Sequence, residues 1–183
     1  TAEEKTYMCS INPKIGKFIK RYVGADDYIN GLERYCLWIE PEEALEALSY
    51  KPISERTEKV RVFRQSSKAP STQAYANKSY MFVQRAYKPT NAIIVPRVSS
   101  ERRKYIPIGF VDKNVIISDS AQAIYDAEVW LFGVLTSYMH MVWVKTVGGR
   151  LKTDYRYSAE LCYNTFPFPK ITETQRKKIE LYA

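Results

Sequence analysis

Histidine, cysteine and glycine are scarce in this sequence, with one, three and seven copies among 183 residues. The single histidine, His140, lies in an apolar segment, which favours a core position over a role as catalytic base or metal ligand. The cysteines are odd in number and far apart, which argues against a disulfide framework and a clustered metal site, and favours a reducing cytoplasm. Gly148-Gly149 lacks the further glycines of a phosphate-binding loop. We therefore predict that this chain catalyses nothing alone.

Long apolar runs are also scarce. The longest, near residues 129–147, is interrupted by Thr136, Ser137, His140 and Lys145. Such a run predicts a buried core helix rather than a membrane span. The polar N-terminus does not resemble a signal peptide. We accordingly expect a cytoplasmic protein with no membrane partner.

Positive charge, by contrast, is abundant and unevenly distributed. The formal net charge is +8, and residues 53–105 hold 12 basic against 3 acidic side chains, net +9, whereas residues 1–50 hold 6 against 9, net −3. A basic middle of this kind suits a polyanion, with nucleic acid first and a membrane surface second. Fifteen tyrosines and 45% hydrophobic residues supply a core and amphipathic interface groups.

Helix and turn signals define the first half of the chain. Asn30-Gly31 predicts a hairpin between two strands within residues 22–40, and Pro41 opens a short helix. Ser54 can cap a helix that carries part of the basic cluster and ends near Ser66.

The second half alternates short strands with helices. Four β-rich runs are expected at residues 79–85, 91–98, 104–110 and 114–118. A long apolar helix over 127–147 is capped by Asp126 and ends at Gly148-Gly149. Gly133 inside it predicts close packing against the sheet. Thr172 and Gln175 form a capping box for a last helix. We predict an α+β fold, with a mixed or antiparallel sheet of short strands packed with a long apolar helix in a single domain.

The stretch VGGRLKTDYRYSAE, residues 147–160, carries charges at every second position: Arg150, Lys152, Asp154 and Arg156. A period of two predicts a strand with one charged face. One interpretation is a solvated face whose charges pair with one another. The alternative is a surface that reads bases, since Lys and Arg donate to guanine and Asp accepts from the amino group of cytosine. A Lys and an Asp two residues apart on a face could address both halves of one G·C pair.

A basic loop at residues 96–110, PRVSSERRKYIPIGF, lies between two predicted strands. Hydroxyls and guanidiniums are common phosphate ligands, and loops on a rigid sheet often carry binding residues. A solvated loop without a ligand is the alternative. On the first interpretation, the residues predicted to contact DNA phosphates are Arg97, Ser99, Ser100, Arg102, Arg103, Lys104 and Arg150.

Four stretches together resemble a known family: RYVGADDYINGLERYCLWIE, IIVPRVSSERRKYIPIGF, SDSAQAIYDAEVWLFGVLTSYMHMVWVKTVGGRLKTDYRYS and YNTFPFP. In the same order, they resemble the target-recognition domain of type IIG/IIL restriction–modification enzymes and of related adenine-specific DNA methyltransferases. The resemblance runs from about Phe18 to Pro169, while residues 66–90 do not match firmly. It implies a linker from an upstream methyltransferase domain at 1–17, a target-recognition domain at 18–169, and the start of a C-terminal helical region at 170–183.

The resemblance implies sequence-specific recognition of double-stranded DNA, which positions an adenine for N6 methylation in the adjoining methyltransferase domain. S-adenosylmethionine, and Mg²⁺ where an endonuclease is fused, would belong to the parent enzyme, and no cofactor is expected in these residues. Base-reading positions of the family follow GGRL, which places Lys152 and Asp154 as a pair and Arg156 together with Ser120. The alternative function is a non-catalytic basic domain that binds RNA or an acidic protein partner.

Overall fold

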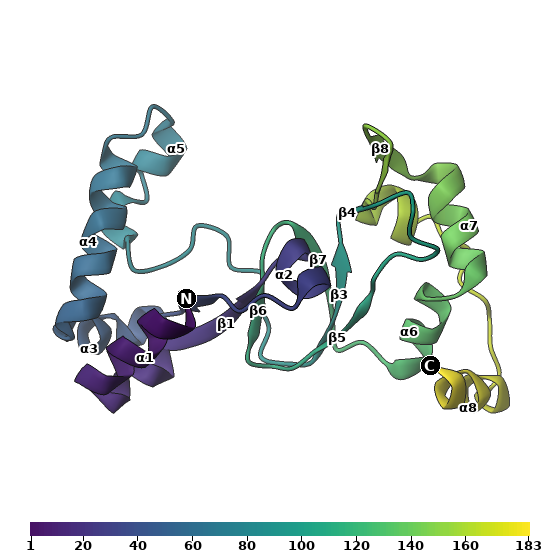
Figure 1. Cartoon of the computed structure of the whole chain (residues 1–183), viewed down its shortest axis with the longest axis horizontal. Coiled ribbons are helices and arrows are strands. Elements are labelled where there is room, and N and C mark those ends of the chain that lie inside the picture. The colour runs from purple at the N-terminus through teal and green to yellow at the C-terminus, as the bar shows by residue number, and fades with distance from the viewer. The chain divides into compact units, whose positions relative to one another are not determined.

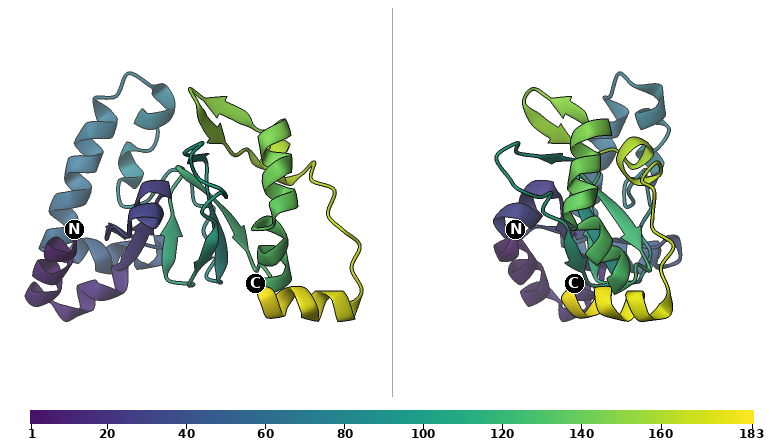
Figure 2. Two further views of the ribbon diagram at one scale, coloured as in Figure 1. Left: turned by 45° about the vertical axis from the view of Figure 1, so that its right-hand side comes forward. Right: turned by 90° about the vertical axis from the view of Figure 1, so that its right-hand side faces the viewer.

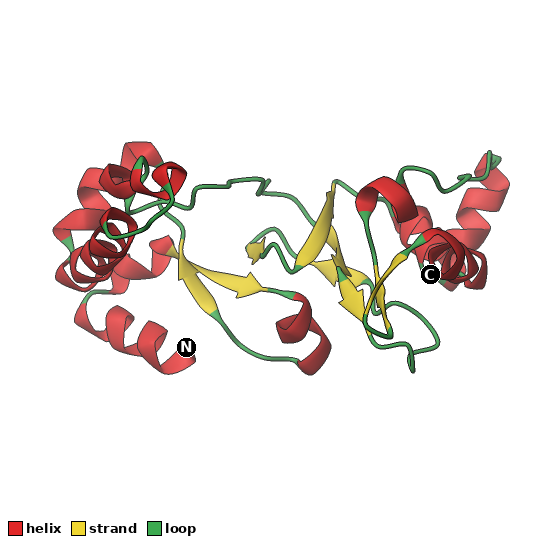
Figure 3. Cartoon of the chain, turned by 90° about the horizontal axis from the view of Figure 1, so that it is seen from above, coloured by secondary structure: helices red, strands yellow, loops and turns green.

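The computed structural model describes residues 1–183, which fold as two compact units with separate cores (Figure 1). The first unit comprises residues 1–22 and 33–87, and the second comprises residues 23–32 and 88–183. Helices and short antiparallel strands build both, as the secondary-structure colouring in Figure 3 shows, so the predicted α+β class is confirmed. No helix is both long enough and apolar enough to cross a membrane.

The first unit combines helices with a two-stranded ribbon. Strand β1 (Ile19–Val23) pairs antiparallel with β2 (Tyr35–Leu37), with Lys20 opposite Cys36. Ile15, Phe18, Ile39 and Ile53 are fully buried at the centre of its core. Its helical elements are α1 (Ala2–Ile11), η1 (Pro13–Phe18), η2 (Pro41–Glu43), α3 (Ala44–Ser49), α4 (Lys51–Gln65), α5 (Pro70–Gln73) and η3 (Ala76–Lys78).

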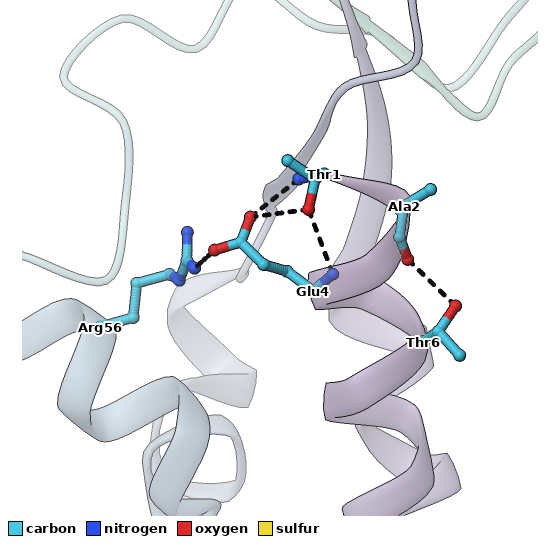
Figure 4. Close-up of polar contacts among 5 residues, drawn as sticks. All are labelled: Thr1, Ala2, Glu4, Thr6 and Arg56. Carbon is cyan, nitrogen blue, oxygen red and sulfur yellow. Dashed lines mark hydrogen bonds and ion pairs between the residues drawn. The ribbon is translucent and has the colours of Figure 1, made fainter.

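Residues 1–17, predicted as a linker, are built into this unit. Met8 of α1 and Ile15 of η1 lie in its core. The Thr1 hydroxyl accepts the N–H of Glu4 at 3.2 Å and so caps α1, and Glu4 forms an ion pair with Arg56 of α4 (Figure 4). The segment is therefore attached to α4 by both apolar and ionic contacts.

Two small sheets organise the second unit. The first has the order β5 (Gly109–Val111), β3 (Ala92–Pro96) and β7 (Ala121–Tyr125), and every residue of β3 is buried. The second has the order β4 (Val98–Ser99), β9 (Asp154–Arg156) and β8 (Gly149–Leu151). Both are antiparallel. The remaining elements are α2 (Ala25–Asn30), β6 (Val115–Ile117), α6 (Val129–Leu135), α7 (Tyr138–Val147), the π-helix η4 (Ala159–Tyr163) and α8 (Glu173–Tyr182).

The main core of the second unit lies between these strands and the helices α6 and α7, which run beside them (Figure 2). Ile93 and Val95 of β3 pack there with Leu135 and Val144. His140 is only 1% exposed, so its predicted core position is confirmed. Its Nε2 lies 3.0 Å from the Tyr157 hydroxyl, while its Nδ1 is buried without a partner.

Turn chemistry differs from prediction in the first half of the chain. Two strands, β1 and β2, do pair on either side of Asn30-Gly31, but this dipeptide is not a hairpin turn: Asn30 ends α2, and Gly31, at φ 65°, is its left-handed C-cap. Residues 79–85 form no strand. Helix α4 begins at Lys51 with Pro52 in its first turn, and the Ser54 hydroxyl donates to the Lys51 carbonyl instead of capping the helix.

The predicted helix over 127–147 is broken in two. The Ser137 side chain accepts the N–H of His140 and so caps α7, which a short hydroxyl side chain can do at the cost of a continuous helix. Asp126, at φ 56°, precedes Glu128, the actual N-cap of α6. A Cβ at Gly133 would meet Ile179 of α8, so this glycine packs against a helix and not against the sheet. The predicted end at Gly148 and the Thr172–Gln175 capping box are confirmed.

Candidate nucleic-acid interface

The charged stretch after Gly148 is a tight hairpin and not one strand. Leu151 pairs with Asp154, so Lys152 and Thr153 form a two-residue turn at its tip. Lys152 is exposed and has φ 57°, which such turns require. The prediction that Lys152 and Asp154 share one strand face is therefore wrong. The usual Asn-Gly or Asp-Gly signal is absent from this turn, which is why the alternation suggested a continuous strand.

The two faces of the hairpin differ sharply. Cross-strand partners share a face, and so do residues two apart on one strand, so Leu151, Asp154 and Arg156 lie on one side. Arg150 and Tyr155 lie on the other, where Tyr155 is buried. We call the side with Leu151, Asp154 and Arg156 the outer face. It leaves Arg156 and Leu151 exposed and Asp154 half-buried.

Arg150 is held by its neighbours on the inner side of the hairpin. Its guanidinium carbon lies 4.1 Å from the centre of the Tyr155 ring, and its Nη1 donates to the Thr153 carbonyl at 3.1 Å. These contacts stabilise the turn. Arg150 still has free N–H groups, but part of its donor capacity is used within the hairpin.

The basic loop at residues 100–104 approaches the outer face of this hairpin. Its backbone turns at Ser100, whose carbonyl accepts the N–H of Arg103 at 3.0 Å and whose hydroxyl accepts the N–H of Arg102 at 3.3 Å. The N–H of Glu101 donates to Oδ1 of Asp154 at 3.2 Å. Arg102, Arg103 and Lys104 are exposed and form no ion pair. The loop therefore presents unneutralised cations beside the outer face.

Ser99 does not reach this surface. It pairs with Tyr155 across β4 and β9, is 3% exposed, and its Oγ is buried without a hydrogen-bond partner. The phosphate contact predicted for Ser99 is not available in this arrangement, because the strand pairing turns its side chain inward. Ser100 is half-buried, and its hydroxyl already serves the turn.

Ser120 and Arg156 are joined through the backbone of Arg97. The Ser120 carbonyl accepts the N–H of Arg97 at 3.1 Å, and the carbonyl of Arg97 accepts the N–H of Tyr157 at 2.8 Å. The Ser120 hydroxyl accepts the N–H of Ala25 at 2.9 Å. Ser120, the exposed side chain of Arg97 and Arg156 thus come from neighbouring backbone positions. The Ser120 hydroxyl, however, is already used as an acceptor at the start of α2.

The cations of α4 lie in a different electrostatic setting. Three of its five cations form ion pairs with carboxylates of the first unit, which reduces the positive field that the helix presents to a polyanion. This weakens the prediction that the helix predicted at 54–66 supplies phosphate affinity. The partners are Glu55 for Lys51, Glu4 for Arg56, Glu58 for Arg61, and the carbonyls of Tyr75, Lys78 and Met81 for Arg64. Lys59 forms no ion pair.

Comparisons with known proteins agree on one family. The family model described as "MmeI, target recognition domain" matches residues 1–170. DNA methyltransferase A of Bacillus subtilis (strain 168) is 42% identical over 181 residues, which are 98% of this chain and 20% of that protein. The solved structure of the type IIL restriction-modification enzyme MmeI in complex with DNA is 41% identical, with a TM-score of 0.92 over 99% of this chain and 24% of that one. The chain thus spans about a fifth to a quarter of the length of these relatives.

Proposed function

The chain belongs to the family of MmeI target-recognition domains, and from that premise we propose that it reads a short double-stranded DNA sequence for the DNA methyltransferase of which it is one part. The observation that carries this proposal is the outer face of the β8–β9 hairpin beside the loop at residues 100–104. That face holds an acceptor, Asp154, and a donor, Arg156, next to three cations without ion pairs. Donors and acceptors together suit base edges, and free cations suit phosphates.

In the proposed complex, Asp154 accepts from the amino group of a cytosine, and Lys152 donates to O6 or N7 of its paired guanine. Lys152 approaches from the turn at the tip of the hairpin, and Asp154 from the strand that follows. Arg156, two residues further along the outer face, addresses a neighbouring base pair with Ser120 beside it. A hairpin of two strands fits the width of the major groove.

Phosphate contacts fix the register of the duplex without reading its sequence. We assign them to the exposed cations Arg97, Arg102, Arg103 and Lys104, with Ser100 and Arg150 contributing the donors that their own contacts leave free. Within residues 53–105 the loop and its flank hold four cations without ion pairs, whereas most cations of α4 are paired with carboxylates.

The parent enzyme supplies the chemistry. We propose adenine-N6 methylation, for which S-adenosylmethionine is the methyl donor when bound elsewhere in the parent. The 183 residues contain no glycine-rich loop and no group of three His, Cys, Asp or Glu placed to hold a metal ion. What this chain contributes is binding and orientation of the duplex, so that the target adenine reaches the adjoining methyltransferase domain. A fused endonuclease would be positioned by the same contacts.

The test exchanges the two charges proposed to read one base pair. In the full-length parent, Lys152→Glu with Asp154→Arg should change the methylated sequence at one position, from G toward C, because the acceptor and donor swap places. A matched control exchanges Glu173→Arg with Lys177→Glu on α8, where both side chains are exposed. Methylation-site mapping reads both variants. A recognition sequence unchanged in the hairpin variant contradicts base reading by this pair.

A further inference from the structure

One hydrogen bond joins the reading hairpin to the phosphate-binding loop. Oδ1 of Asp154 accepts the N–H of Glu101 at 3.2 Å, across 53 positions of sequence. No other hydrogen bond connects residues 100–104 to the hairpin. The same carboxylate therefore belongs to both parts of the proposed interface.

The loop is anchored at its two ends but not at its tip. Before the tip, Val98 and Ser99 pair with Arg156 and Tyr155. After it, Ile106 is 5% exposed and belongs to the core of the second unit. Between these anchors the exposed side chains of residues 101–104 contribute no packing that would fix them.

The N–H groups of the tip explain why a carboxylate is needed there. Ser100 satisfies the N–H groups of Arg102 and Arg103 by its own hydroxyl and carbonyl. The N–H of Glu101 points out of this turn and meets Asp154. A hydrogen bond to an ionised acceptor is roughly twice as strong as a neutral one, so it can hold an otherwise mobile tip.

We propose that Asp154 is a positioning residue for the basic loop as well as a base reader. Its carboxylate holds Arg102 and Arg103 where they can contact the DNA phosphates beside the hairpin. This rests on the proposed function. A carboxylate offers about four acceptor positions on two oxygens. Oδ1 binds the loop, and Oδ2 is left for the amino group of a cytosine. Phosphate binding and base reading are thereby coupled through one side chain.

Two variants at Glu101 isolate the loop contact without touching Asp154. Glu101 is the second residue of the turn closed by Ser100 and Arg103, a position that favours proline. Glu101→Pro removes the N–H and keeps the turn, whereas Glu101→Ala removes the same negative charge and keeps the N–H. The comparison between these variants therefore cancels the effect of charge.

Two variants at Asp154 separate its two roles. Asp154→Asn retains an oxygen acceptor for the Glu101 N–H but places an amide where cytosine requires an acceptor. Asp154→Ala removes both functions. All four variants are made in the full-length parent and measured by binding to specific and random duplexes over a salt series, with thermal unfolding to verify the fold.

We expect Glu101→Pro to bind every duplex about tenfold more weakly than Glu101→Ala, which is the value of one hydrogen bond of about 1.4 kcal/mol, with a shallower salt dependence and the native sequence preference. Asp154→Asn should keep the salt dependence and lose the preference for one base pair, while Asp154→Ala should lose both. Deuterium uptake of the peptide around residue 101 should be low in the native enzyme and in Asp154→Asn, and higher in Asp154→Ala.

Equal affinity and equal salt dependence of Glu101→Pro and Glu101→Ala would overturn the positioning role, and so would equal deuterium uptake in the native enzyme and Asp154→Ala. These outcomes are distinct from failure of the proposed function, in which the native enzyme itself would show no preference between specific and random duplexes.

Discussion

The exposed cations of the loop at residues 100–104 and the paired cations of α4 should affect DNA binding very differently. Arg102→Ala with Arg103→Ala removes two charges that form no ion pair. Lys51→Ala with Arg61→Ala removes two charges that are already paired with Glu55 at 3.8 Å and Glu58 at 2.5 Å. The formal net charge falls by the same amount in both variants, so any difference between them reflects position and pairing.

The size of the expected effect follows from counterion release. Each phosphate contact contributes about 0.9 to the slope of log affinity against log salt concentration, so loss of two contacts should lower the slope by about 1.8. Between 50 and 200 mM salt, a slope difference of that size changes affinity by about twelvefold. The α4 variant should retain the native slope.

A fluorescence-anisotropy titration of the full-length enzyme with specific and random duplexes, at four or more salt concentrations, measures these slopes. The loop variant should lose affinity for both duplexes by the same factor, because phosphate contacts do not read sequence. If both variants flattened the slope equally, total charge would matter and the pairing argument would fail. A change of base preference in the loop variant would show that Arg102 or Arg103 reads bases.

Two further predictions concern the fold of the second unit. Gly133→Leu should lower the free energy of unfolding by about 1–3 kcal/mol, because any side chain at residue 133 meets Ile179 of α8. The control Val142→Leu, on an exposed part of α7, should leave the free energy of unfolding unchanged. Thermal denaturation measures both variants. Burial lowers the pKa of His140 to about 4 from an ordinary 6.5. Between these two pH values the unfolded chain therefore binds one proton that the folded chain does not. The free energy of unfolding should fall as the pH drops from 6.5 toward 4, by up to about 3 kcal/mol. His140→Gln should remove this part of the pH dependence of the unfolding temperature, and an identical pH profile would contradict it.

Local signals predicted the features of this fold that depend on few residues. Gly148 ends α7, and Thr172 with Gln175 caps α8, because capping is decided by side chains within one turn of a helix. The burial of His140 followed from the apolar residues around it. The β-rich runs containing residues 92–96 and 115–117 form strands, since each holds three consecutive β-branched residues and no competing helix signal.

Features set by distant partners were not predictable from the sequence. Asn30-Gly31 suits a hairpin locally, but α2 docks onto the Ser118–Ser120 turn, where the Ser120 hydroxyl accepts the N–H of Ala25, and the glycine becomes a helix cap. The sequence alone predicts that the basic residues of α4 are available to bind phosphates. The ion pair of Arg56 depends on Glu4, 52 positions away, and the guanidinium of Arg64 donates to carbonyls of residues 75–81, which occupy its N–H groups but leave its charge. The sequence predicts that Ser99 is a loop hydroxyl, whereas strand pairing with Tyr155 turns its side chain inward.

In the hairpin, the alternation of charge predicted a set of base-reading residues on a strand geometry that the structure does not have. Tyr155 and Tyr157 are buried at every second position and fix the strand against the core, while Arg156 between them is exposed. Lys152 belongs to no strand face, and its side chain is set by a left-handed turn at the tip. A change at Lys152 therefore disturbs neither the ladder nor the core, whereas a change at Asp154 also affects the hydrogen bond to the N–H of Glu101 in the basic loop. If Lys152 and Asp154 read one base pair, a substitution at Lys152 should alter specificity with the smaller loss of stability. A substitution at Asp154 that alters specificity should also weaken phosphate binding, unless the new side chain keeps an oxygen acceptor.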